Sequence, residues 1–182
     1  MSATEQAQQV IRFWRDAGPD RWYRKDDDFD HSIASTFGAL HEAAARGELN
    51  SWAETPEGAL ALLLLLDQFS RNMFRGSPRT FAQDAQARQI ARRALANGFD
   101  TMVDDDLRQF FYLPFMHSES LPDQELCVKL CHGLPDRNTL PYARDHERII
   151  RRFGRFPHRN GVLGRHTSPA EQAFLDGGGF AG

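Results

Sequence analysis

Cysteine is scarce in this sequence of 182 residues, which contains only Cys127 and Cys131. Their four-residue spacing fits neither the CxxC redox motif nor a four-ligand zinc site. We therefore expect two reduced, half-buried cysteines on one helix. A chain of this length buries roughly 70% of the surface that its unfolded form exposes, so its core needs no disulfide or structural metal.

The sequence also lacks a long hydrophobic run. Its longest, ALALLLLL at 59–66, is far shorter than the roughly 20 residues that a membrane-spanning helix needs. This run predicts a core helix and no membrane partner. The first residues, MSATEQAQQVIRFW, are polar where a signal peptide has its apolar segment, so we expect a cytoplasmic protein.

A basic charge excess is absent, because the formal net charge is −3. This balance excludes a surface built throughout for nucleic acid, and no nucleic-acid partner is expected. Motifs for a nucleophile elbow, a phosphate loop and a dinucleotide-binding turn are missing too. His146-Glu147 is followed by Arg-Ile-Ile-Arg and not by the second histidine of a zinc protease. The sequence therefore predicts no cofactor.

No segment alternates as a half-buried strand does, and the apolar spacing is helical almost throughout. Turn and cap residues divide this pattern into eight helices: one ending near Gly18-Pro19, then 29–46, one from Thr55-Pro56, one from 77–80 to Gly98, one from Asp104, one after Ser120, Pro141 to Gly154, and one after Ser168. We expect an all-α domain of seven or eight helices over 1–182, arranged as an α-α superhelix or irregular bundle. A short flexible tail is predicted from about residue 177.

The helix from Pro56 is apolar nearly all round until its first charges, Asp67 and Arg71. An acid four residues before a base is the favourable order for a helical ion pair, and Arg75 lies one turn further. A structural salt bridge is the simplest interpretation. We also expect this helix to be the most buried element, with Leu63 and Leu66 in the core.

Two other segments place polar groups at predicted helix ends. FFYLPFMHSES (110–120) follows its proline with His117 and Glu119, and RFGRFPHRN (152–160) ends in His158, Arg159 and Asn160. Pro114 is expected to kink or end a helix. We predict that the phenylalanines anchor the second turn while the polar residues face a shared cleft. Satisfied turn residues and helix caps are the alternative.

Together with LLLDQFSRNMFRG (64–76), these segments make the chain resemble the bacterial domain-of-unknown-function family 924, from about residue 10 to 174. The resemblance implies an α-α superhelical, tetratricopeptide-like fold and brings no established activity. The residues that match the family pattern are Asp67, Arg71, His117, Glu119, His158, Arg159 and Asn160. Met116 stands where the family usually has an acidic residue, and Ser70 where it often has proline, so a scheme that needs a carboxylate at 116 lacks support.

Two functional hypotheses follow, and a purely structural or protein-interaction domain is the third possibility. In the favoured one, a cleft holds an anionic small molecule or peptide carboxylate, because guanidinium groups match such anions. Its ligand-binding residues are Arg71, Arg75, Arg155, Arg159 and Asn160. In the other, a metal-independent enzyme uses His117 or His158 as general base, oriented by Asp67 or Glu119.

Both hypotheses need Asp67, Arg71, His117 and His158 to line one cavity. His117, Glu119 and His158 offer metal-binding atoms, but the nearby arginines repel a cation, so no metal site is predicted. The sequence sets no oligomeric state and does not decide between binding and catalysis.

Overall fold

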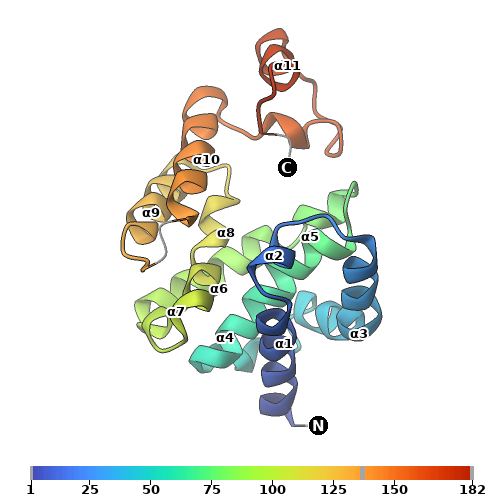
Figure 1. The fold of residues 1–182 in the computed structure, drawn as a ribbon, viewed down its shortest axis with the longest axis vertical. Coiled ribbons are helices and arrows are strands. Elements are labelled where there is room, and N and C mark those ends of the chain that lie inside the picture. The colour runs from blue at the N-terminus through green and yellow to red at the C-terminus, as the bar shows by residue number, and fades with distance from the viewer. Residues whose placement is uncertain (1, 136–137, 181–182) are drawn as a thin grey trace. The chain divides into compact units, whose positions relative to one another are not determined.

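A computed structural model describes residues 2–135 and 138–180, and over these residues it contains helices and no strand, which confirms the all-α class. Within the described part of the chain, seven helices have eight or more residues: α1 (Ala3–Ala17), α3 (Asp27–Ala45), α4 (Pro56–Leu63), α6 (Asp84–Ala96), α9 (Leu121–Cys131), α10 (Thr139–Phe153) and α11 (Pro169–Asp176) (Figure 1). Four are single turns: α2 (Pro19–Trp22), α5 (Ser70–Met73), α7 (Asp105–Arg108) and α8 (Leu113–Met116). No helix among the described residues is long and apolar enough to cross a membrane.

The described residues divide into two compact units. The first comprises the residues up to Arg75 together with Arg79–Pro114, and the second comprises Gly76–Pro78 and the residues from Phe115 onward. The single domain over 1–182, the flexible tail and the tetratricopeptide-like superhelix stay predictions.

Most predicted caps are confirmed. The Thr55 hydroxyl accepts a hydrogen bond from the Gly58 amide at the start of α4, and Gly154, with φ of 71°, ends α10. The helical turns that begin at Asp105 end at Phe111, and Pro114 is the second residue of the next helix, α8, in agreement with the predicted break. One local prediction is wrong. The Ser120 side chain makes no capping hydrogen bond; the Asp123 amide donates to the Ser120 carbonyl, and the Asp123 carboxylate accepts from the Ser118 hydroxyl at 2.7 Å.

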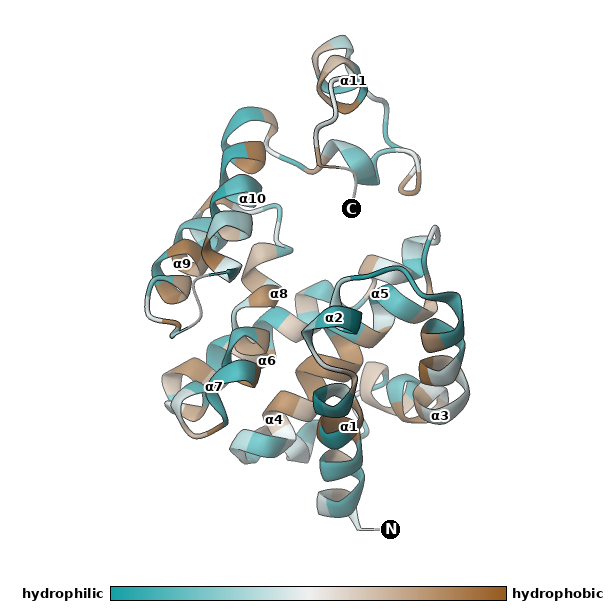
Figure 2. Ribbon diagram, in the orientation of Figure 1, coloured by the Kyte–Doolittle hydropathy of each residue, from teal (hydrophilic) through white to brown (hydrophobic). Residues whose placement is uncertain are grey.

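The first unit is built around the helix from Pro56. α4 continues through a π-helical turn, Leu64–Phe69, into α5, and residues 58–70 are all buried. Leu63 and Leu66 are inaccessible to solvent, as predicted. Figure 2 shows brown, hydrophobic colour along α4 and its continuation. α1, α3 and α6 pack against this element and enclose it.

The second unit is centred on α9 and α10, which pack side by side (Figure 1). Ile149, Ile150 and Phe156 form its buried apolar cluster, against which Leu121, Phe153, Phe174 and Phe180 pack. Cys127 and Cys131 are free thiols on α9, with their sulfur atoms 3.9 Å apart. Both are fully buried, so the expectation of half-buried cysteines is wrong.

Candidate functional site

The first unit contains a buried charged group at the end of the central helix. Arg71 Nη1 lies 3.0 Å from Asp67 Oδ1, which confirms the predicted i,i+4 ion pair. The same nitrogen donates to the Asp67 carbonyl at 2.9 Å. Asp67 is only 1% exposed and lies within the π-helical turn. A buried carboxylate is thus held by a guanidinium one turn along the same helix.

Asp84, at the start of α6, is a second partner that sequence reasoning missed. Its carboxylate accepts two hydrogen bonds from Arg71, at 3.0 and 3.2 Å. Burial disfavours the guanidinium charge, but the carboxylates of Asp67 and Asp84 outweigh it and raise the pKa of Arg71. The favourable interaction of its charge with the helix dipole already explains an aspartate at the first position of a helix. Nothing in the sequence therefore indicated that Asp84 pairs with Arg71.

Arg75 pairs with α3 instead. Its Nε donates to Asp30 Oδ2 at 2.5 Å, and the Asn72 amide donates to Asp30 Oδ1 at 2.7 Å. The two arginines predicted to hold an anion in this part of the chain therefore bind carboxylates of the protein itself. In this unit the geometry favours the structural interpretation that the sequence analysis left open.

The Ser70 hydroxyl links the end of the π-helical turn to His41 on α3. It donates to the Leu66 carbonyl at 2.8 Å and lies 2.9 Å from His41 Nε2. Because the serine proton is directed to Leu66, His41 Nε2 is the donor to the serine oxygen. Burial lowers the pKa of His41, so this imidazole is neutral near pH 7.

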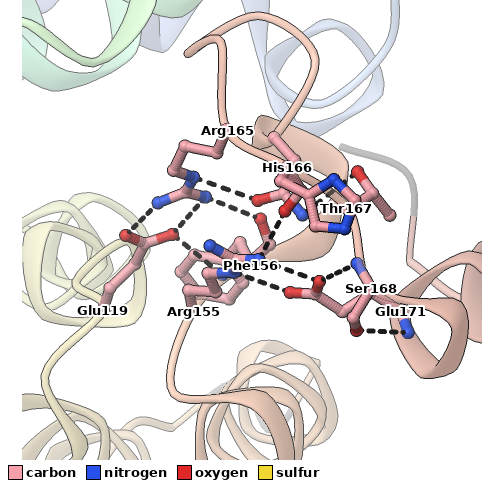
Figure 3. Close-up of polar contacts among 9 residues, drawn as sticks. Glu119, Arg155, Phe156, Arg165, His166, Thr167, Ser168 and Glu171 are labelled. Carbon is pink, nitrogen blue, oxygen red and sulfur yellow. Dashed lines mark hydrogen bonds and ion pairs between the residues drawn. The ribbon is translucent and has the colours of Figure 1, made fainter.

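In the second unit, a salt bridge joins the 110–120 segment to the turn after α10. Glu119 accepts hydrogen bonds from Arg165 at 2.8 and 2.9 Å and one from the Phe156 amide at 2.8 Å (Figure 3). Arg165 also donates to the Phe156 carbonyl at 3.0 Å and, through Nε, to Asn160 Oδ1 at 3.0 Å. Glu119 and Asn160 are thereby brought together by Arg165, which the sequence analysis did not select.

A second pair holds the far side of this turn. Arg155 donates to both oxygens of Glu171, at 2.6 and 2.9 Å, and to the His166 carbonyl at 2.7 Å (Figure 3). Glu171 also accepts from the Ser168 amide at 2.8 Å, in the capping box at the start of α11. The two ion pairs fix the turn from both ends.

His158 and Arg159 lie on the single helical turn Pro157–Arg159 between these pairs. Arg159 donates to the His117 carbonyl at 2.8 Å, with its guanidinium 4.6 Å from the centre of the Phe156 ring. His158 Nδ1 is buried and has no hydrogen-bond partner among the described residues. Burial, followed by the charge of Arg159, lowers the pKa of His158 to about 3.

His146 on α10 is the third histidine of this unit, and the sequence analysis had considered it only within an absent zinc motif. Its Nδ1 donates to the Tyr142 carbonyl at 2.8 Å, and its ring lies 6.5 Å from that of His117. A helical pattern that ends at Gly154 gives no signal that this position faces the turn. No group of three or more histidine, cysteine or acidic residues within 2–135 and 138–180 is arranged to hold a metal ion.

The predicted site residues are thus distributed over both units. Asp67, Arg71 and Arg75 belong to the first, and the second holds His117, Glu119, Arg155, His158, Arg159 and Asn160. Those of the second unit lie within one hydrogen-bonded turn region. A common cavity lined by residues of both units stays a prediction.

Comparison with known proteins assigns this chain to a family. The model of a bacterial protein family of unknown function, DUF924, matches residues 10–179. A solved structure of the protein of unknown function ATU0120 from Agrobacterium tumefaciens shares 45% identity, with a TM-score of 0.94 over 97% of this chain and 99% of that one. None of the curated proteins matches. The chain therefore belongs to the DUF924 family of bacterial proteins of unknown function.

Proposed function

We propose that the protein binds an anionic small molecule at the turn Phe156–Asn160, with His158 Nδ1 as the group that hydrogen-bonds it. The observation that carries this proposal is the buried, unpartnered Nδ1. Buried polar atoms are nearly always hydrogen-bonded, so a buried atom without a partner needs an explanation, and a ligand that hydrogen-bonds it supplies one. A neutral imidazole protonated on Nδ1 donates to a carboxylate oxygen.

The local electrostatics favour an anion. Burial is the first cause of the lowered pKa of His158. Of the nearby charges, that of Arg159 has the larger effect and that of Glu119 acts in the opposite direction. The positive charge of Arg159 beside the imidazole attracts a carboxylate. The expected ligand class therefore remains an anion. The direct hydrogen bond to it comes from His158, which lies beside Arg159.

The arginines themselves take a supporting role in this proposal. Arg155 is held by Glu171 through two hydrogen bonds, and Asn160 accepts from Arg165. These contacts keep the turn in place before a ligand arrives, which lowers the entropic cost of binding. Arg71 and Arg75 are assigned a structural role in the first unit.

Catalysis by His158 is the less favoured hypothesis. An efficient general base has a pKa near the working pH, whereas the pKa of His158 is about 3. Such an imidazole accepts a proton poorly but still forms a hydrogen bond. Binding is therefore the function that this geometry supports best.

Thermal unfolding with small carboxylates at constant ionic strength tests the proposal. A ligand at 100 times its dissociation constant stabilises the native state by about 2.7 kcal/mol. His158→Phe keeps the aromatic volume and removes Nδ1, so the stabilisation should vanish. His166→Phe, at an exposed histidine of the same loop, should retain it. Equal stabilisation of wild type and His158→Phe would refute this site, and no stabilisation of wild type would leave a structural domain.

A further inference from the structure

His158 belongs to a cluster of four aromatic rings in the second unit, together with Phe156, His146 and Phe180. The Phe156 ring centre lies 5.4 Å from that of His146 and 5.5 Å from that of His158. Phe180 contacts the same two imidazoles, at 4.5 and 5.1 Å. Phe156 is fully buried, whereas Phe180 is partly exposed. Phe156 is thus the inner member of this four-ring cluster and Phe180 the outer one.

The backbone after α11 directs Phe180 to this place. The Gly178 amide donates to the Leu175 carbonyl and the Gly179 amide to the Phe174 carbonyl, which is the Schellman arrangement with Gly178 at φ 78°. A side chain on Gly179 would meet the Phe174 ring at 2.5 Å, so glycine is required there. The predicted glycine-rich tail is therefore turned back through defined hydrogen bonds as far as residue 179.

Phe180 itself is held only by apolar contacts. Over residues 2–135 and 138–180 its backbone and side chain make no hydrogen bond, and its ring packs on the cluster of Ile149, Ile150 and Phe156. A ring held this way can be replaced by another ring without leaving a buried polar group unsatisfied. The outer position of the four-ring cluster is thus suited to exchange.

Phe180 fills this position but offers no polar atom to His158. Its ring lies edge-on to the His158 imidazole, with an interplanar angle of 81°, and Nδ1 of that imidazole has no hydrogen-bond partner among the described residues. A ligand with an aromatic ring and an attached carboxylate satisfies both features at once. Its ring takes the outer position between His146 and His158, and its carboxylate accepts from Nδ1.

We infer that the ligand is a small aromatic carboxylate, and that Phe180 occupies the position of its ring in the unliganded protein. This inference rests on the proposed function, because the carboxylate contact is that of His158. Phe180 then acts as an internal competitor, and the measured affinity is the intrinsic affinity reduced by the fraction of molecules in which Phe180 has left. Removing the Phe180 ring should raise the affinity for aromatic carboxylates and leave that for acetate nearly unchanged.

Isothermal titration with phenylacetate, acetate and benzyl alcohol tests the inference, because the first two probes differ only in the phenyl group. The variants are Phe180→Ala and the control Phe174→Ala, which removes a partly buried ring packed on Phe153 and on the same apolar cluster. We expect phenylacetate to bind Phe180→Ala at least tenfold more tightly than wild type, with Phe174→Ala unchanged within about threefold. If Phe180→Ala does not fold, Phe180→Met keeps an apolar side chain that can move aside, and the same order is expected.

The outcomes separate this inference from the proposed function. If acetate and phenylacetate bind equally and Phe180→Ala changes neither, the aromatic position is refuted and the anion site stands. If benzyl alcohol binds as tightly as phenylacetate, the ring position stands and the carboxylate contact of His158 is refuted. If none of the probes binds wild type, Phe180→Ala or Phe180→Met, both proposals fail.

Discussion

Arg165 donates one hydrogen bond to each carboxylate oxygen of Glu119, at 2.8 and 2.9 Å, across 46 positions of the sequence. The side chains are 23% and 28% exposed, so the pair is only partly screened by solvent. Glu119 also accepts from the Phe156 amide. This relationship fixes the turn that carries His158.

Replacing Glu119 with Gln should destabilise the protein by about 1–3 kcal/mol at pH 7, because Arg165 and the Phe156 amide lose a charged acceptor. Urea unfolding measures the change. Glu125→Gln is the matched control: Glu125 pairs with Arg151 where both side chains are more than half exposed, and its loss should stay within about 0.5 kcal/mol. Equal losses in the two variants would contradict the role of Glu119.

The difference in unfolding free energy between wild type and Glu119→Gln should also depend on pH. Burial opposes ionisation of Glu119, but the hydrogen bonds from Arg165 and the Phe156 amide outweigh it and lower its pKa. The stabilisation is therefore fully present above the ordinary pKa of 4.5 and is lost as pH falls through the folded-state value. The difference between wild type and Glu119→Gln should shrink below pH 4.5.

Local structure could be predicted from the sequence wherever one short stretch determines it. Gly154 and Ser168 marked helix ends because left-handed backbone and capping hydroxyls have few substitutes. The Asp67–Arg71 pair followed from helical spacing alone. These features depend on neighbours within one helical turn.

The partners that complete the candidate site could not be predicted in the same way. Arg165 binds Glu119 across 46 positions, and Asp84 reaches Arg71 from another helix. Such pairs depend on how elements pack, which no local spacing records. The π-helical turn was not predicted either. A stretch that is apolar on nearly all sides has no hydrophobic periodicity, so its sequence does not indicate the number of residues per turn.

Leu66 tests the packing of the first unit. The residue is inaccessible to solvent inside the π-helical turn, so Leu66→Ala should cost roughly 2–5 kcal/mol in urea unfolding. Leu163→Ala, at a leucine that is 37% exposed, should cost less than about 0.5 kcal/mol. A loss at position 66 as small as that at 163 would show that the helix is peripheral.

Arg71→Ala tests the buried charges. The substitution removes the guanidinium that Asp67 and Asp84 share, and breaking such a pair costs about 3–5 kcal/mol. Arg46→Ala removes the exposed pair with Glu48 and should change stability far less, because solvent screens that pair. If Arg71→Ala unfolds no more easily than Arg46→Ala, the charged group does not contribute to folding.

His158 should make the protein sensitive to mild acid. Burial and the charge of Arg159 lower its folded-state pKa to about 3, against an ordinary value of 6.5. Between these values the unfolded chain binds a proton that the native state refuses, so this group reduces stability as pH falls below 6.5. His158→Phe removes that proton uptake, and its stability should therefore decline less than that of wild type between pH 7 and pH 5.

Unfolding by urea at several pH values gives both slopes, and the exposed His166→Phe should follow wild type. Parallel slopes for wild type and His158→Phe would show that the imidazole is hydrated or paired in solution, and the unsatisfied Nδ1 on which the binding proposal rests would be lost.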